Sequence, residues 1–144
     1  FVLVTAVCAS LLAQLIKVLL NLFIFHRFIA ERMWGAGGMP SSHSATVCAM
    51  VVATGRYCGV SSPIFAIAAV LSIIVMYDAM GVRYETGEQA KVLNRMFTEW
   101  MDQGFEQFQL PHGKKLKEMV GHTPIEVLTG AALGIVLGFA MPMV

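Results

Sequence analysis

Residues 2–25 read VLVTAVCASLLAQLIKVLLNLFIF, and this run decides the fold class of the chain. A helix that crosses a bilayer needs about 17 to 25 mostly apolar residues, and this run is long enough. Three further apolar runs follow, at 42–57, 63–80 and 124–143. The sequence therefore predicts an all-α integral membrane helical bundle with about four transmembrane helices. The run at 42–57 is short, so either its ends are expected to lie in the membrane interface or its helix runs through protein rather than lipid.

The composition favours the same class. Of the 144 residues, 57% are hydrophobic and 13% are charged, whereas soluble domains contain about 25% charged residues. Ten Lys and Arg against nine Asp and Glu leave a net charge of +1. This balance excludes the dense basic face that binds a nucleic-acid backbone. We expect residues 1–144 to form a single membrane domain that contacts membrane lipids.

A more polar segment, residues 81–121, separates the third and fourth apolar runs. Val92, Met96 and Trp100 recur within it at helical spacing, with Leu93 and Phe97 beside them. This pattern predicts an amphipathic helix that lies on the membrane face or caps the bundle.

The distribution of Lys and Arg predicts the orientation of the bundle, because cytoplasmic connections carry an excess of them. With four spans, the first and third connections share one side of the membrane and hold eight basic residues, against Arg56 on the other side. We expect that basic side to be cytoplasmic and both termini to lie outside, in the plasma membrane if the organism is bacterial. The eight are Arg27, Arg32, Arg83, Lys91, Arg95, Lys114, Lys115 and Lys117.

Three polar clusters interrupt the apolar sequence, at residues 37–44, 78–83 and 121–126. In a bundle of four spans all three lie on the same membrane face. Clusters that converge in this way are expected to build one site.

The first cluster is a glycine- and proline-containing turn that enters a helix. Ser41 and Ser42 suit the N-cap, and free N–H groups at a helix start favour an anion. The cluster is therefore a candidate phosphate cradle, with His43 beside it. The alternative is that the glycines and serines only turn and cap the chain.

His122 and Glu126 in the third cluster are four residues apart, so a helix places them on one face. A carboxylate that holds one imidazole nitrogen leaves the other as a base, nucleophile or metal ligand. With His122 as the N-cap, Pro124 falls in the first turn, where proline is tolerated. The alternative is that both residues only cap the helix.

Lys17 lies inside the first apolar run, on one helical stripe with Ser10, Gln14 and Asn21. Polar residues within a span face protein or water and are candidates for function. Lys17 is therefore a candidate phosphate-binding residue, with snorkelling as the alternative. Gln14 and Asn21 are expected to be packing partners.

Asp78 and Arg83 bracket the turn at the end of the third run. They form either a structural ion pair or a phosphate-binding arginine with an orienting carboxylate. In the fourth run, Gly130, Gly134 and Gly138 recur every four residues. This small-residue stripe lets helices approach closely, either within the chain or in a homo-oligomer.

At these residues the sequence resembles the divergent branch of the type 2 phosphatidic acid phosphatase superfamily, a membrane family also described as related to acid phosphatases and vanadium-dependent haloperoxidases. The resemblance covers nearly the whole chain: Lys17, GGMPSSHSA at 37–45, YDAMGVR at 77–83, GEQA at 87–90 and GHTPIEVLTGAALG at 121–134.

The better-known relatives carry the motifs K-x6-R-P, P-S-G-H and S-R-x5-H-x3-D. Residues 40–43, Pro-Ser-Ser-His, resemble the second motif with Ser in place of Gly. His122 and Glu126 resemble the end of the third, with Glu in place of Asp. Ile24 and Leu116 stand where those motifs place arginines, so Arg83, Lys115 or Lys117 would have to supply that charge.

The resemblance implies a metal-independent phosphatase, without a cofactor, that acts on a lipid phosphate or pyrophosphate. It makes His122 the nucleophile that becomes phosphohistidine, Glu126 the residue that orients it, and His43 the general acid. We expect phosphate to be bound by the polar and basic side chains Lys17, Ser41, Ser42 and Arg83, with Asp78 orienting one of them.

Two other readings use the same residues. His43, Asp78, His122 and Glu126 are a plausible ligand set for a divalent metal ion, which would make the phosphatase metal-dependent. Alternatively, the chain binds or transports a lipid phosphate or another anion without catalysis, having lost the arginines of the motifs. This reading predicts ligand binding without turnover.

Overall fold

The computed structural model describes residues 1–25, 38–103, 115–118 and 121–143, and the regular structure within them is entirely helical. The helices are α1 (Val2–Phe25), α3 (Ser42–Cys58), α4 (Pro63–Met80), α5 (Val82–Asp102) and α6 (Pro124–Ala140). The predicted bounds of α1 and α4 match these, α3 is one residue longer than predicted, and α6 ends three residues earlier. The all-α prediction is confirmed.

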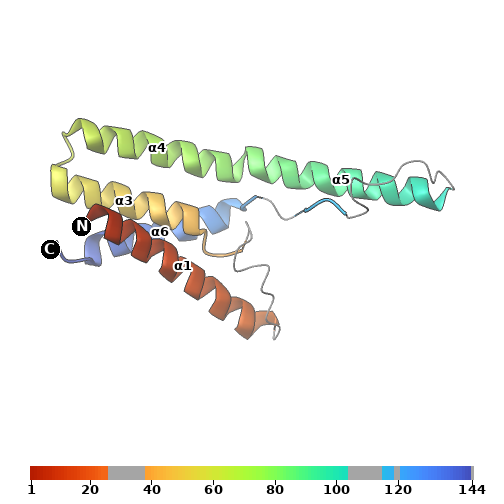
Figure 1. Ribbon diagram of the computed structural model, residues 1–144, viewed down its shortest axis with the longest axis horizontal. Coiled ribbons are helices and arrows are strands. Elements are labelled where there is room, and N and C mark those ends of the chain that lie inside the picture. Colours follow the sequence, from red (N-terminus) through yellow and green to blue (C-terminus); the bar gives the residue numbers. More distant parts are fainter. Residues whose placement is uncertain (26–37, 104–114, 119–120, 144) are drawn as a thin grey trace.

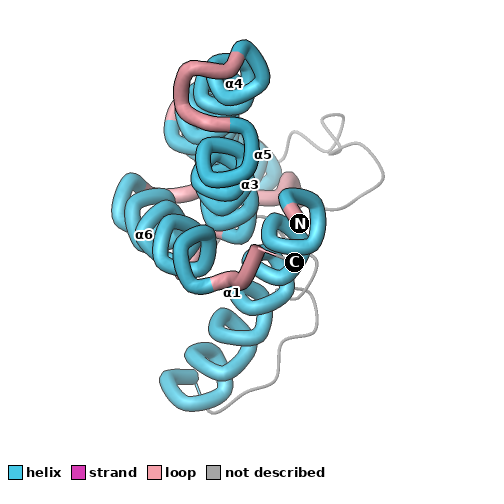
Figure 2. The backbone as a smooth tube through the Cα atoms, turned by 90° about the vertical axis from the view of Figure 1, so that its left-hand side faces the viewer, coloured by secondary structure: helices cyan, strands magenta, loops and turns pink. Residues whose placement is uncertain are grey.

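Helix α3 lies at the centre of the bundle and packs against α1, α4 and α6 (Figures 1 and 2). The outer helices expose many leucine, isoleucine and valine side chains. In α3, by contrast, the exposed large apolar side chains are limited to Tyr57 near its end. Surrounded by other helices, α3 needs less apolar surface and less length than a helix in contact with lipid.

The side chains are distributed as in a membrane protein, with large apolar groups outside and small ones inside. The central cluster consists of Ala9, Ala13, Ala45 and Ala49, all fully buried, and the partly buried Leu133 and Leu137 pack against it. Among the described residues, two helical segments are long and apolar enough to span a membrane, Val2–Phe23 and the stretch Pro63–Asp102, and α6 is apolar but shorter. Small residues at helix contacts and large ones toward lipid are typical of membrane bundles.

The glycine stripe of α6 faces α3. A Cβ atom at Gly130 or Gly134 would collide with the main-chain oxygen of Ser41 or Ala45, and one at Gly138 would meet the side chain of Val52. Of the two uses that the sequence left open for this stripe, the structure shows packing within the chain.

Helix α5 is the predicted amphipathic helix, but the alternative that it caps the bundle is wrong, since α5 contacts α4 and no other helix of the described structure. Only Gly81 separates it from α4, and α5 continues in nearly the direction of α4, away from the bundle (Figure 1). It therefore neither lies across the end of the bundle nor caps it. The spacing of apolar residues predicts that a helix forms, but not the angle at which it leaves the preceding one.

Candidate active site

The three polar clusters meet at one end of the bundle. The last turns of α1 and α4 and the first turns of α3 and α6 lie at this end, because successive spans run in opposite directions (Figure 1). At the opposite end, Arg56 donates hydrogen bonds of 2.6 and 2.7 Å to the carbonyls of Gly138 and Met141, which ties the C-terminus of α6 to α3.

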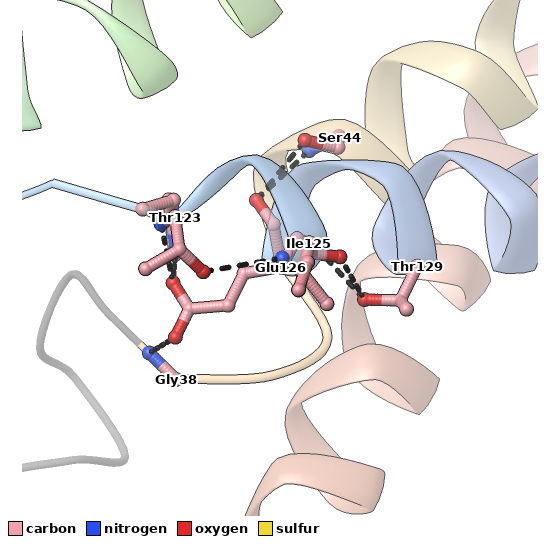
Figure 3. Close-up of polar contacts among 8 residues, drawn as sticks. Gly38, Ser44, Thr123, Ile125, Glu126 and Thr129 are labelled. Carbon is pink, nitrogen blue, oxygen red and sulfur yellow. Dashed lines mark hydrogen bonds and ion pairs between the residues drawn. The ribbon is translucent and has the colours of Figure 1, made fainter.

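Glu126 is the most connected side chain of the site (Figure 3). Its Oε2 lies 3.2 Å from Nδ1 of His122 and accepts a hydrogen bond of 2.9 Å from the backbone N–H of Thr123. Its Oε1 accepts a hydrogen bond of 3.1 Å from the backbone N–H of Gly38. Two N–H donors fix the carboxylate, so it acts as an acceptor toward His122 and assigns the proton of the imidazole to Nδ1.

The N-cap of α6 is Thr123 rather than His122, which corrects the register expected from the sequence. Thr123 Oγ1 accepts a hydrogen bond of 3.4 Å from the backbone N–H of Glu126, and the Glu126 carboxylate in turn accepts one from the backbone N–H of Thr123, completing a capping box. Pro124 then occupies the first helical position. The reciprocal bonds hold Glu126 at the helix start and leave the His122 side chain outside the helix.

His122 is held from two sides by main-chain contacts. Its N–H donates a hydrogen bond of 3.1 Å to the carbonyl of Ala79 at the end of α4. The preceding Gly121 packs so closely on α5 that a Cβ atom would collide with the main chain of Tyr84. The imidazole is 2% exposed, and its Nε2 has no hydrogen-bond partner within the described ranges. The lone pair of Nε2 is therefore buried, and the contacts that hold His122 fix its direction.

Burial lowers the pKa of His122 below its ordinary value of 6.5, and the hydrogen bond and charge of Glu126 oppose this shift without cancelling it. A neutral imidazole is therefore the main form at neutral pH. This protonation state is the one that a nucleophile or base requires.

His43 lies beside His122, with 6.1 Å between the ring centroids. Both line a small pocket of about 20 Å³, together with Val75, Asp78, Ala79 and Arg83. The pocket thus combines two imidazoles, a carboxylate and a guanidinium from α3, α4, α5 and the segment before α6. We call it the histidine pocket.

Arg83 and Asp78 form an ion pair, with 2.6 Å between Nε and Oδ2. Their side chains are 50% and 40% exposed, so water screens the pair and it contributes little to stability. The pair leaves the two terminal nitrogens of the guanidinium for other acceptors. Both interpretations from the sequence are compatible with this arrangement, since the ion pair itself borders the histidine pocket.

The two serines before His43 have different surroundings. Ser41 is fully buried and caps α3, with its Oγ 3.4 Å from the backbone nitrogen of Ser44 and 3.1 Å from Ser44 Oγ. Its backbone N–H donates to the carbonyl of Glu126. Ser41 therefore joins α3 to α6, and it does not line the histidine pocket. Ser42 faces α1 and accepts a hydrogen bond of 3.4 Å from Gln14 Nε2.

Lys17 is 2% exposed and lies behind the site rather than in the histidine pocket. The methylene groups of Lys17 pack against Gly38, where a Cβ atom would lie 3.4 Å from Lys17 Cδ. Gly38 has a φ of +88°, a conformation that favours glycine, and from this position its N–H reaches Glu126. The ammonium group interacts electrostatically with Glu126, His43 and His122.

The proposed metal ligands do not gather into a metal site. Among the residues that the structure describes, no three His, Cys, Asp or Glu side chains are placed to hold one metal ion. His122 and Glu126 contact each other, whereas Asp78 is paired with Arg83. The donor set His43, Asp78, His122 and Glu126 therefore does not fit a metal ion in this arrangement.

Asn94 is a residue of this region that the sequence analysis did not single out. It is 5% exposed and binds the main chain of Leu116 with both ends of its amide, at 2.8 and 2.9 Å, and donates a third hydrogen bond to Glu118. It thereby attaches residues 115–118, which lead toward His122, to α5. Asn94 follows the small residues Gly87 and Ala90 at helical spacing, so all three lie on one face of α5. This pattern could have indicated Asn94 from the sequence.

Comparison with known proteins places the chain in a family. The model of the divergent PAP2 family matches residues 1–137. The chain belongs to the divergent PAP2 family. A relative of similar sequence is the Bacillus subtilis (strain 168) protein described as the uncharacterized membrane protein YuiD, which is 38% identical over 95% of this chain and 90% of its own length. No solved structure matches this divergent PAP2 chain.

The match to the divergent PAP2 family covers the polar clusters as well as the apolar helices. The three segments that meet at the histidine pocket all lie inside the matched region. Together with the helical bundle, the membrane-protein relative supports a location in a membrane.

Proposed function

We propose that this protein is a membrane-embedded phosphatase that hydrolyses a lipid phosphate or pyrophosphate through a phosphohistidine intermediate. One observation carries the proposal. His122 is buried and held by Glu126 at Nδ1, and its Nε2 is without a partner in the described part of the chain, beside His43 and Arg83. A nucleophile, the residue that orients it, a proton donor and a cation are the groups that phosphoryl transfer to histidine requires.

In the first step, Nε2 of His122 attacks phosphorus and the bond from phosphorus to the ester oxygen breaks. His43 donates a proton to that oxygen, so the alcohol leaves in neutral form. The imidazole of His122 becomes positively charged as it takes the phosphoryl group, and the Glu126 carboxylate at Nδ1 stabilises this charge.

In the second step, water attacks the phosphohistidine. His43, now neutral, accepts a proton from the water, the phosphorus–nitrogen bond breaks, and inorganic phosphate leaves. Both histidines return to their starting states, so the cycle consumes one water per phosphate released.

Positive charge for the phosphoryl oxygens comes from two sides in this proposal. Arg83 exchanges part of its contact with Asp78 for phosphate, and its exposure permits this movement. Lys17 acts through space from behind Gly38, because it interacts electrostatically with both histidines. These two cations take over the task of the arginines whose motif positions hold Ile24 and Leu116.

A lipid phosphate suits the position of the site at the end of a membrane bundle, since the tail remains in lipid while the phosphate reaches the histidines. The excess of Lys and Arg in the connections at this end supports a cytoplasmic position for the site.

The experiment measures inorganic phosphate released by detergent-purified protein from prenyl and glycerolipid phosphates and pyrophosphates, with and without a chelator. We expect chelator-resistant release by the wild type and by the control Arg95→Ala, whose side chain is exposed on α5. His122→Ala and His43→Ala should each lower release at least about a hundredfold. Full activity in both histidine variants would contradict the mechanism, and loss of activity with chelator would favour the metal-dependent alternative.

Ile24 and Leu116 favour a second candidate function, because they remove two guanidinium groups from the motif positions. In that case the same site binds or transports a lipid phosphate without hydrolysing it. Binding of a lipid phosphate by folded protein, with no phosphate release across the panel, would support this second function.

A further inference from the structure

A larger pocket lies next to the histidine pocket, with a volume of about 530 Å³. Ser10 and Gln14 of α1 form one wall, α3 forms the floor, and Val75 of α4 lies on the other side. In the described structure α1 and α4 each contact α3 but not each other, which leaves this space between them. We call it the inter-helix pocket.

The lining of the inter-helix pocket is unusually polar for its surroundings. Apart from Val47 and Val75, the side chains that line it are Ser10, Gln14, Ser42, His43 and Thr46. Large apolar side chains surround it on the outer faces of α1 and α4. A pocket that held only a hydrocarbon tail would leave the hydrogen-bonding capacity that these side chains do not use among themselves without partners, at a cost in free energy.

His43 and Val75 line both pockets, so the two spaces adjoin at the proposed proton donor. In the proposed reaction, His43 protonates the ester oxygen between phosphorus and the leaving alcohol. A phosphate in the histidine pocket therefore directs the alcohol, on the far side of His43, into the inter-helix pocket.

The hydrogen bonds already made in the pocket indicate which groups remain for a ligand. Thr46 donates its proton to the carbonyl of Ser42 at 2.7 Å, so its oxygen is left as an acceptor. Gln14 uses its Nε2 on Ser42 Oγ, and its Oε1 has no partner within the described residues. Thr46 therefore leaves an oxygen acceptor in the pocket, and Gln14 Oε1 is a buried, unpaired acceptor that a rotation of the amide would present to the pocket. Such acceptors pair with a ligand that donates hydrogen bonds.

We propose that the inter-helix pocket binds the leaving alcohol of the substrate and that this alcohol carries a free hydroxyl group close to the phosphoester. The inference rests on the proposed phosphatase function and narrows its substrate to hydroxylated lipid phosphates. Gln14 is the specificity-determining residue, because a turn of its amide brings Oε1 to a hydroxyl donor in the pocket. Fully acylated and prenyl alcohols lack that donor.

The test compares two substrates that differ by one hydroxyl group, a 1-acylglycerol 3-phosphate and its 2-deoxy analogue with the same acyl chain. For detergent-purified wild type, kcat/KM should be about tenfold higher for the hydroxylated substrate, as one hydrogen bond of about 1.4 kcal/mol gives. In Gln14→Met, which keeps the length of the side chain but not its acceptor, the ratio of the two values should fall close to one.

The matched control is Leu15→Met, at the neighbouring position that faces outward with 54% exposure, and it should keep the wild-type ratio. A wild-type ratio of about one, or an unchanged ratio in Gln14→Met, would overturn the inference.

Binding of the same two lipids to full-length His122→Ala protein separates this inference from the proposed function. A tenfold preference for the hydroxylated lipid, lost in His122→Ala/Gln14→Met, would support the pocket assignment even if the wild type hydrolysed neither lipid. Equal binding of both lipids would contradict the pocket assignment and leave the phosphatase mechanism intact.

Discussion

At the residue scale, the arrangement of Glu126 determines what His122 is able to do. The carboxylate is fixed by two main-chain N–H groups, one from its own capping turn and one from Gly38, which is 88 positions away in sequence. The turn before α3 and the start of α6 therefore together set the direction from which the carboxylate approaches Nδ1 of His122. The imidazole has little freedom to turn Nε2 away from the histidine pocket.

The pH dependence of hydrolysis is expected to report this arrangement. Protonation of His122 removes the attacking lone pair, so activity is present above the pKa of His122 and is lost as the pH falls through it. Because burial lowers that pKa, the acid limb of kcat/KM should lie below pH 6.5. Glu126 raises the pKa of His122, so Glu126→Gln should move the limb to still lower pH and reduce kcat about a hundredfold.

The control for this profile is Glu88→Gln, which removes an exposed carboxylate paired with Lys91 and should leave the acid limb in place. An acid limb that moved to higher pH in Glu126→Gln would show that Glu126 does not stabilise the imidazolium of His122.

At the scale of elements, the segment before α6 depends on α5 for its position. The side-chain amide of Asn94 hydrogen-bonds both the backbone N–H and the backbone carbonyl of Leu116, as a neighbouring β-strand would. Gly121 makes the next close contact, at the beginning of α5. The segment that carries the proposed nucleophile is therefore aligned along a helix that projects beyond the bundle (Figure 1).

Asn94→Ala should release this segment. The variant removes three hydrogen bonds of a nearly buried side chain, and we expect the free energy of unfolding to fall by about 2 kcal/mol. Trypsin should cut faster after Lys115 and Lys117, as followed by mass spectrometry of the native protein in detergent. Arg95→Ala, at the adjacent exposed position, should be cut at the wild-type rate. Equal cleavage of both variants would contradict the role given to Asn94.

The sequence predicts the elements better than the contacts between them. Composition alone predicts α1 and α4, because long apolar runs in lipid have few alternatives to a helix. Thr123 rather than His122 is the N-cap because Thr123 and Glu126 form a capping box. The spacing T-x-x-E at 123–126 is the sequence signature of that capping box. The contacts of Glu126 with Gly38 and of Asn94 with Leu116 join distant segments, and neither spacing nor hydropathy contains that information.

At the scale of the whole molecule, the two ends of the bundle differ in chemistry. The site end gathers histidines, carboxylates and basic side chains. At the other end, Cys58, the last residue of α3 before the turn to α4, is exposed. If the site faces the cytoplasm, this turn faces the outside of the cell.

Thiol labelling is expected to show this orientation. A membrane-impermeant maleimide added to intact cells should react with Cys58, since Cys48 is buried and Cys8 lies within α1. Cys58→Ser should abolish the labelling, and Lys115→Cys in that background should react only after the cells are opened. Labelling of Lys115→Cys in intact cells would reverse the orientation.

The alanine and glycine packing between α1, α3 and α6 has a consequence for sequence change. Soluble cores are damaged chiefly when large side chains are truncated, because truncation leaves cavities. Here Ala9, Ala13, Ala45 and Ala49 offer almost nothing to truncate, while backbones touch at Gly130 and Gly134. The interior should therefore tolerate loss of volume and reject even one added methyl group, so a mutational scan of this bundle would be sensitive to growth rather than to deletion.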